Sequence, residues 1–218
     1  MATASAVASL ALDLFLTVLA PPRCAACDAP VARLAAFCAA CRSTVEDAPA
    51  GDDADAMAAF AYGGAIAKAV TRMKYEARPD VARPLGDLLW RALEPRGDEL
   101  RTCLVVPVPL HPGRLAERGF NQSALVARRV AGHLGAPLAA RAMARSIDTP
   151  KQATLDRETR RTNVAGAFRV RQTHLVRGRR VLLVDDVRTT GATLDACAHA
   201  LRAAGAVAVL SAVVARTG

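Results

Sequence analysis

Residues 181–206, VLLVDDVRTTGATLDACAHALRAAGA, predict a strand, a turn and a helix in succession. The apolar run at 181–184, within the strand expected at 180–184, is typical of a strand that is buried on both faces of a parallel sheet. Gly205 follows the expected helix at 192–204 and is the residue type that most often terminates one. Two aspartates and the turn TTGAT lie between the strand and the helix, and they raise the question of function.

The turn has the composition of a phosphate-binding cradle. Thr189, Thr190 and Thr193 can each donate a hydroxyl hydrogen to an anion. Gly191 lets the backbone approach closely, and the N–H groups of the turn, that of Ala192 included, lie at a helix N-terminus, where anions bind.

The two aspartates, Asp185 and Asp186, stand at the carboxyl end of the expected strand, beside this cradle. Their carboxylates can accept hydrogen bonds from the vicinal hydroxyls of a sugar. Open α/β sheets bind their ligands at this edge. The stretch therefore predicts a ribose 5-phosphate site, with the phosphate in the threonine turn and the 2- and 3-hydroxyls on the aspartates.

From residue 57 onward, apolar strand patterns alternate with helix patterns. Strands are expected at 57–62, 103–108, 138–143, 180–184 and 206–214, and helices around 66–73, 84–93, 121–134 and 192–204. This order predicts an α/β domain at 57–218, built on a parallel, doubly wound sheet. No GK[ST] follows the glycine turn and no GxGxxG is present, which excludes a Walker-type or dinucleotide-type phosphate loop.

Four cysteines in residues 21–45, Cys24, Cys27, Cys38 and Cys41, have the spacing C-x2-C-x10-C-x2-C. Each CxxC turn directs two thiolates at one centre, so two such turns predict a tetrahedral, structural zinc site with all four ligands from protein. A redox dithiol, the alternative, would have one pair next to the βαβ core. Metal binding would supply the folding energy of so small an element.

The other two cysteines, at 103 and 197, stand alone in apolar surroundings, which favours a reducing compartment and a cytoplasmic protein. Residues 1–20 predict a short amphipathic helix, too short and too interrupted to span a membrane. A secretion signal is the alternative, but no Lys or Arg precedes the apolar run. Residues 46–56, EDAPAGDDADA, have the composition of a linker.

The net charge of +9 is concentrated in one segment. Residues 141–180 hold 11 Lys and Arg against 3 Asp and Glu, whereas the rest of the chain holds 18 against 17. Such a block suits a polyanion, either nucleic acid or a phosphate-rich small molecule. A solvated, arginine-rich surface is the alternative.

Several motifs together resemble a known family. VLLVDDVRTTGAT resembles the phosphoribosyl pyrophosphate motif of type I phosphoribosyltransferases, with Arg188 as a small departure at the variable position. PPRCAAC, KYEARPD, VVPVPLHPGRLAERGFNQSALVA and KQATLDRETRRTNVAGAF precede it in the order seen in the competence-associated ComF family. The resemblance covers nearly the whole chain and implies a type I phosphoribosyltransferase-like fold with an N-terminal zinc element.

The resemblance also implies roles for residues. The loop after the first core strand contacts pyrophosphate in such enzymes, which points to Arg114 and Arg118, although solvated loop charges are the alternative. Asn121 either caps the next helix or touches ligand, and His111 is expected to serve loop structure.

The catalytic loop of the family corresponds to about 146–168, with Lys151, Gln152 and Arg157 as the best candidates for contacts to the leaving group. Asp185 and Asp186 would orient the ribose, and one of them would assist proton transfer. Magnesium would accompany the pyrophosphate.

Three functions follow from this resemblance. The first is a phosphoribosyltransferase acting in natural competence and DNA uptake, with an unidentified acceptor. The second is a non-catalytic factor that binds phosphoribosyl pyrophosphate as a regulator and contacts single-stranded DNA or competence proteins. The third is a zinc-stabilised interaction module, against which the intact aspartate pair and threonine turn count. The basic block suits the first two equally.

Overall fold

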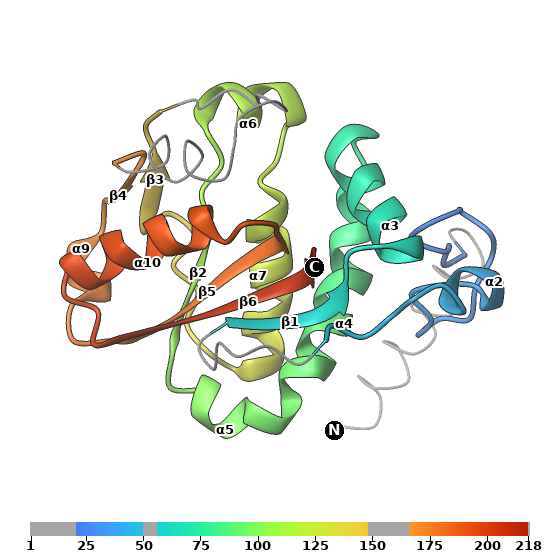
Figure 1. Cartoon of the computed structure of the whole chain (residues 1–218), viewed down its shortest axis with the longest axis horizontal. Coiled ribbons are helices and arrows are strands. Elements are labelled where there is room, and N and C mark those ends of the chain that lie inside the picture. The colour runs from blue at the N-terminus through green and yellow to red at the C-terminus, as the bar shows by residue number, and fades with distance from the viewer. Residues whose placement is uncertain (1–20, 50–55, 148–165, 218) are drawn as a thin grey trace, which may run out of the picture.

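The computed structural model of the chain describes residues 21–49, 56–147 and 166–217. Within these ranges four strands form one parallel sheet in the order β1-β6-β5-β2 (Figure 1). A short antiparallel pair, β3-β4, forms a second sheet. The strands are β1 (Ala56–Ala61), β2 (Leu104–Pro107), β3 (Met143–Arg145), β4 (Phe168–Val170), β5 (Arg180–Arg188) and β6 (Ala208–Arg216).

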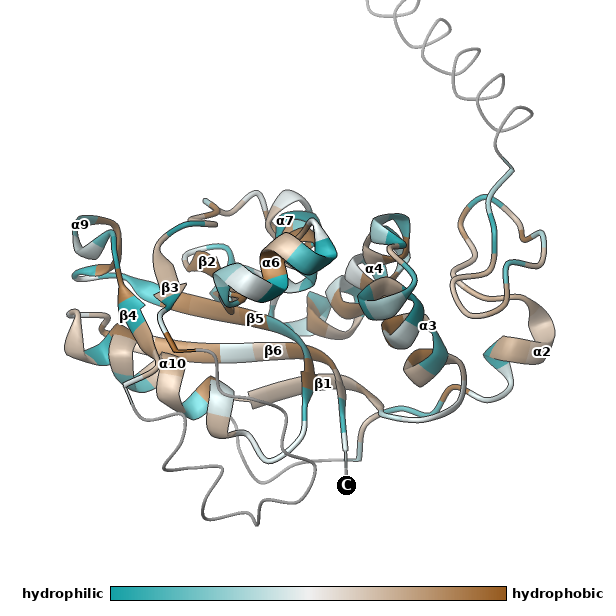
Figure 2. Ribbon diagram, turned by 90° about the horizontal axis from the view of Figure 1, so that it is seen from above, coloured by the Kyte–Doolittle hydropathy of each residue, from teal (hydrophilic) through white to brown (hydrophobic). Residues whose placement is uncertain are grey.

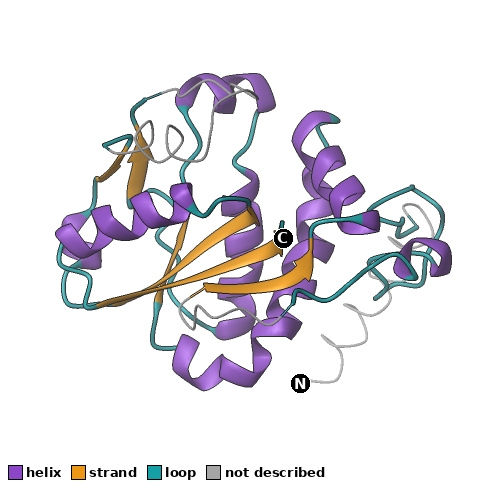
Figure 3. Ribbon diagram, in the orientation of Figure 1, coloured by secondary structure: helices purple, strands orange, loops and turns teal. Residues whose placement is uncertain are grey.

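Helices connect the parallel strands, as the sequence predicts (Figure 3). They are α2 (Ala39–Arg42), α3 (Gly64–Tyr75), α4 (Ala82–Leu93), α5 (Gly97–Leu100), α6 (Pro112–Arg118), α7 (Gln122–Leu134), α9 (Thr173–Val176) and α10 (Ala192–Ala203), with 3-10 turns at Pro79–Val81 and Glu94–Arg96. No helix in the described ranges has the length and apolar character needed to cross a membrane.

The sheet is covered on both faces, which confirms the doubly wound α/β prediction. Helices α4 and α7 pack together on one face, and α10 with β3 and β4 lies on the other (Figure 2). Alternate residues of β5 enter the two resulting cores: Leu182 and Val184 pack with the α4–α7 side, Val181 and Leu183 with the α10 side. Burial on both faces explains why β5 begins as an unbroken apolar run.

The carboxyl end of β5 differs from the prediction. The strand continues to Arg188, so Asp185 and Asp186 lie within it and not after its end. Strand β6 pairs with β5 through to Arg188, but β2 ends where Pro107 faces Val184. Beyond Val184, no strand of the described ranges pairs with β5 on its β2 side, and the two aspartates there line an open cavity.

The strand expected at 138–143 is wrong. Leu138 makes only an isolated parallel bridge with Val105, and the chain then turns, with the Ala142 N–H donating to the Ala139 carbonyl at 3.1 Å. Arg141 interrupts the apolar run within this turn. Strand β3 starts only at Met143 and pairs antiparallel with β4.

Other predicted boundaries agree closely with the structure. The helix expected at 121–134 is α7, which ends at Gly135 in the left-handed conformation. Residues 46–48, in the expected linker, pair antiparallel with β1 through an isolated bridge between Asp47 and Phe60. The expected helix at 1–20 and the linker residues 50–55 lie outside the described residues.

Candidate functional site

An open cavity of about 320 Å³ lies at the carboxyl end of the parallel sheet. It brings together seven of the residues that the sequence singles out, which are Arg114, Arg118, Asn121, Asp185, Asp186, Thr189 and Thr193. They come from the loop and helix after β2, from β5, and from the turn into α10. Residues as far as 79 positions apart in the chain, Arg114 and Thr193, therefore face one space.

Asp185 is held in a polar but buried position. Its side chain accepts a hydrogen bond from the Ser123 hydroxyl at 2.6 Å, and the same oxygen accepts the Asp186 backbone N–H at 2.9 Å. Burial, and next to it the charge of Asp186, raise the pKa of Asp185 to about 7. At neutral pH this carboxyl is thus near the midpoint between its acid and its base form.

Asp186 makes an ion pair that the sequence analysis missed. The Lys74 ammonium, from the last turn of α3, lies 2.7 Å from the second carboxylate oxygen of Asp186. The two side chains are only 20% and 4% exposed, so the pair is shielded from solvent. Burial, the largest single effect, lowers the pKa of Lys74, but the charge and hydrogen bond of Asp186 and the charge of Asp185 together outweigh it, so the pKa lies above its ordinary value. The motif KYEARPD, quoted for the family resemblance, was the available signal.

The turn between β5 and α10 is built around Gly191. This residue caps the N-terminus of α10 with φ near +84°, a left-handed conformation that glycine adopts without strain. A Cβ atom here would also lie 3.1 Å from the Arg188 guanidinium. The N–H of Ala192 has only a long contact, 3.4 Å, with the Thr190 hydroxyl. The start of α10 thus keeps the donors and the positive dipole end of an anion site.

Cationic side chains dominate the cavity wall. Lys74, Arg114, Arg118 and Arg145 line it against the two aspartates, so its field favours an anionic ligand. Arg118 is also held in place, because it donates to the side chain of Gln122 and its guanidinium carbon lies 5.9 Å from the centre of the Tyr75 ring. Of the described arginines of the 141–180 block, only Arg145 lines this cavity.

Asn121, whose role the sequence leaves open, and His111, which it assigns to loop structure, both cap helices. The Asn121 side-chain oxygen accepts the backbone N–H of Ser123 at 3.0 Å, and its amide donates to the Val108 carbonyl at 3.0 Å. Asn121 therefore caps α7, which is one of its two predicted roles, and it also lines the cavity, so a contact with ligand stays a prediction. His111 caps α6 by accepting the Gly113 N–H at 3.2 Å. Lys151 and Arg157 lie outside the described residues.

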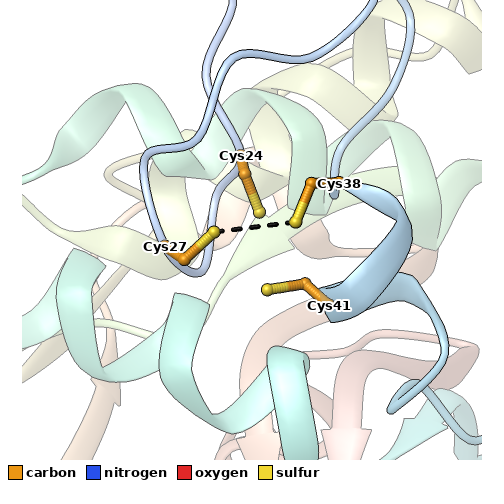
Figure 4. A group of neighbouring side chains, drawn as sticks. All are labelled: Cys24, Cys27, Cys38 and Cys41. Carbon is orange, nitrogen blue, oxygen red and sulfur yellow. Dashed lines mark hydrogen bonds between the residues drawn. The ribbon is translucent and has the colours of Figure 1, made fainter.

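The four cysteines form a second centre, away from the cavity. Their sulfur atoms all lie within 4.8 Å of one another, and Figure 4 shows them converging from a loop and from α2. The Cys27 and Cys38 sulfurs are 3.7 Å apart, close to the roughly 3.8 Å edge of a tetrahedral Zn–S₄ site with bonds of about 2.3 Å. The donor set and its spacing fit zinc, with all four positions filled by protein.

Comparisons with known proteins agree with both centres. A double zinc ribbon domain model matches residues 15–51, and a phosphoribosyl transferase domain model matches residues 121–218. The "DNA utilization protein YhgH" of Escherichia coli K12 is 33% identical over 153 residues, which are 68% of this chain and 66% of that protein. The "Competence protein F" of Haemophilus influenzae is 33% identical over 140 residues, 62% of this chain and 61% of that protein.

The chain thus spans a little under two thirds of the length of the curated relatives that it matches. The matches unite the features described above: a four-cysteine zinc ribbon, a parallel sheet with helices on both faces, and a β5–α10 turn of the phosphoribosyl transferase type. The chain belongs to the ComF family of competence protein F and its relatives.

Proposed function

We propose that the cavity binds phosphoribosyl pyrophosphate together with Mg²⁺, and that the protein transfers its phosphoribosyl group to an acceptor during the use of incoming DNA. One observation carries the proposal: two buried adjacent carboxylates stand beside a threonine and glycine turn in a cavity with a cationic wall. A sugar diol, a phosphate and a second anionic group each find a complementary surface there. The names of the relatives support the setting in DNA utilization and competence.

Different residues of the cavity bind different parts of the ligand in this proposal. The N–H groups at the start of α10 and the hydroxyls of Thr189 and Thr193 receive the 5-phosphate. Asp185 and Asp186 accept the ribose hydroxyls. Arg114 and Arg118 face the pyrophosphate, where they stabilise the charge that develops on the leaving group. Lys151 and Arg157 are proposed to join them when the ligand is bound.

Two further groups complete the site. The carboxylate oxygens of the aspartate pair are hard donors of the kind that Mg²⁺ prefers. Magnesium bound with the ligand would supply further charge stabilisation to the departing pyrophosphate. Lys74 offsets the negative charge of the aspartate pair, which would otherwise repel a polyanion.

The direct test is a calorimetric titration of the zinc-loaded protein with phosphoribosyl pyrophosphate and Mg²⁺. We expect micromolar affinity, with ribose 5-phosphate and pyrophosphate each binding at least about 100-fold more weakly, because each makes only part of the contacts. Equal affinity for pyrophosphate alone would show a general anion site, and no binding would sink the proposal.

Affinity should also depend on pH through Asp185. Its pKa of about 7 means that ligand binding, which needs the ionised carboxylate, must expel a proton at lower pH. We expect affinity to rise about tenfold from pH 6 to pH 8. The Asp185→Asn variant is the control, since it keeps the titration of the ligand phosphates and loses that of the protein. The same pH slope in both proteins would contradict this role of Asp185.

A second function has its own supporting observation. Four exposed arginines, Arg169, Arg171, Arg177 and Arg179, lie around β4 and α9, outside the cavity. They suit the backbone of single-stranded DNA, and the protein would then be a non-catalytic factor regulated by phosphoribosyl pyrophosphate. Salt-sensitive DNA binding that the ligand alters would favour this function. Release of pyrophosphate that requires an acceptor would favour the transferase.

A further inference from the structure

The zinc ribbon holds the first turn of α3. The Ala65 N–H, an otherwise open donor at the helix start, donates to the Thr44 hydroxyl oxygen at 3.0 Å. That hydroxyl in turn donates to the Cys41 carbonyl at 2.8 Å. The backbone of the ribbon lies very close to the backbone of α3 here, because a Cβ atom on Gly64 would lie 2.1 Å from the Thr44 carbonyl oxygen. One zinc ligand is therefore two hydrogen bonds away from the start of α3.

The ribbon also holds the other end of α3, through Asp28. Arg72, only 9% exposed, donates to the Asp28 carboxylate at 2.5 Å and to the Cys24 and Ala25 carbonyls at 3.4 and 3.2 Å. Arg78, just beyond the helix, donates to both Asp28 oxygens at 2.7 and 3.0 Å. Arg78 and then Arg72 hold the pKa of Asp28 well below its usual range.

The position of Asp28 depends on the cysteine turn. Its N–H donates to the Cys24 carbonyl at 3.0 Å, and its φ of +63° is a left-handed conformation that a non-glycine residue rarely adopts. Asp28 directly follows the zinc ligand Cys27. The geometry of the metal turn thus sets where its carboxylate meets the two arginines.

Lys74 lies between these two arginines in the chain. It is two residues after Arg72 and four before Arg78, and its ammonium reaches Asp186 in the candidate site. We propose that the zinc ribbon is a positioning device for Lys74, and that Asp28 carries its effect from the cysteine turn to the ligand cavity. The effect of this positioning on the affinity for phosphoribosyl pyrophosphate rests on the function proposed above. By linkage, a ligand that needs Lys74 in place would also tighten the ribbon.

The chain is well suited to a test that needs no ligand. It contains three lysines, Lys68, Lys74 and Lys151, and Lys68 is an exposed internal reference on the same helix. Acetylation by a small anhydride, followed by mass spectrometry, measures the free amine at each position. The ion pair with Asp186 should make Lys74 react at least about tenfold more slowly than Lys68, since it keeps the buried Lys74 amine protonated and shields it from the anhydride.

The decisive variant is Asp28→Asn, and its matched control is Asp80→Asn. Asp80 also pairs with Arg78, at 2.8 Å, but makes no described contact with the ribbon. In zinc-loaded protein we expect Asp28→Asn to speed acetylation of Lys74 about fivefold or more, with Lys68 unchanged, and Asp80→Asn to leave both rates as in wild type. Affinity for phosphoribosyl pyrophosphate should fall by a similar factor in Asp28→Asn only.

The outcomes separate the two proposals. An unchanged Lys74 rate in an Asp28→Asn protein that retains one zinc would overturn the positioning role. If that variant loses its zinc, the double variant Arg72→Gln/Arg78→Gln replaces it, because it removes both arginine partners of Asp28 and leaves the cysteine turn unchanged. An unchanged Lys74 rate in this variant would be equally decisive. A faster Lys74 rate in a protein that never binds phosphoribosyl pyrophosphate would sink the proposed function and leave the link between ribbon and Lys74 standing.

Discussion

Loss of the zinc ion is expected to unfold residues 21–45 while the parallel sheet stays folded. The apolar residues fully buried in this segment are few, namely Cys24, Ala25, Ala26 and Phe37. The one helix described there, α2, has 4 residues. Core burial of this size does not offset the entropy of ordering the segment, so the binding energy of the metal, on the order of 10 kcal/mol, must do so.

Hydrogen exchange measured by mass spectrometry checks this expectation. After chelation, amides of residues 21–45 should lose protection by about two orders of magnitude or more, and α3 should lose part of its protection because it loses its ribbon contacts at both ends. Amides of β5 and β6 should change little, since both strands have their own partners. Equal protection of the ribbon with and without metal would contradict a structural role for zinc.

Single cysteine substitutions test whether the four-cysteine cluster holds the zinc ion. Cys41→Ser should reduce zinc from one ion to below about one tenth per chain, because a serine hydroxyl is a poor ligand at this position. Cys103→Ala is the matched control, a buried cysteine outside the cluster, and should keep its zinc. Zinc loss in both variants would indicate general destabilisation.

The sequence was sufficient where a local pattern determines the structure. The CxxC spacing predicted the convergence of four sulfurs, and Gly191 with its threonines predicted the turn that caps α10. The doubly wound sheet followed from the alternation of strand and helix. These features depend on residues that are neighbours in the chain, so one short stretch of sequence is enough to predict them.

The sequence did not predict contacts between segments that are far apart in the chain. The motif KYEARPD draws attention to Lys74, but it does not indicate that Lys74 faces Asp186, 112 positions later. Nor does the sequence indicate that Ser123 donates to Asp185. The strand expected at 138–143 failed for a similar reason, because pairing with β4 decides where β3 begins. In each of these cases the structure depends on a partner that lies far away in the sequence.

The Asp186→Asn substitution is expected to weaken binding of phosphoribosyl pyrophosphate and Mg²⁺ by about 100-fold or more. The amide removes a charged acceptor for the ribose hydroxyls, a loss of roughly 1.5–3 kcal/mol per hydrogen bond. It also leaves the Lys74 ammonium, 20% exposed, without its charge partner. Calorimetry measures the affinity, and Asp195→Asn is the matched control, an exposed carboxylate in the first turn of α10 that does not line the cavity. Affinity within about threefold of wild type for Asp186→Asn would refute the ribose role.

The neighbouring substitution, Asp185→Asn, should weaken ligand binding and yet stabilise the free protein above pH 7. The folded-state pKa of Asp185, about 7, lies above its unfolded value, so the folded chain binds this proton more tightly. Stability therefore falls as pH rises from about 4 to 7, and the full cost of ionisation is present at pH 8. An asparagine can still accept from the Ser123 hydroxyl and carries no buried charge. Urea unfolding at pH 8 and pH 5 tests the sign: the variant should gain stability over wild type at pH 8 and lose most of that advantage at pH 5. A destabilised variant at pH 8 would mean that the Asp185 carboxylate supports the fold. The substitution is thus predicted to weaken binding and to raise stability. Such a pair of effects is expected where a buried charge destabilises the fold but is needed to bind the ligand.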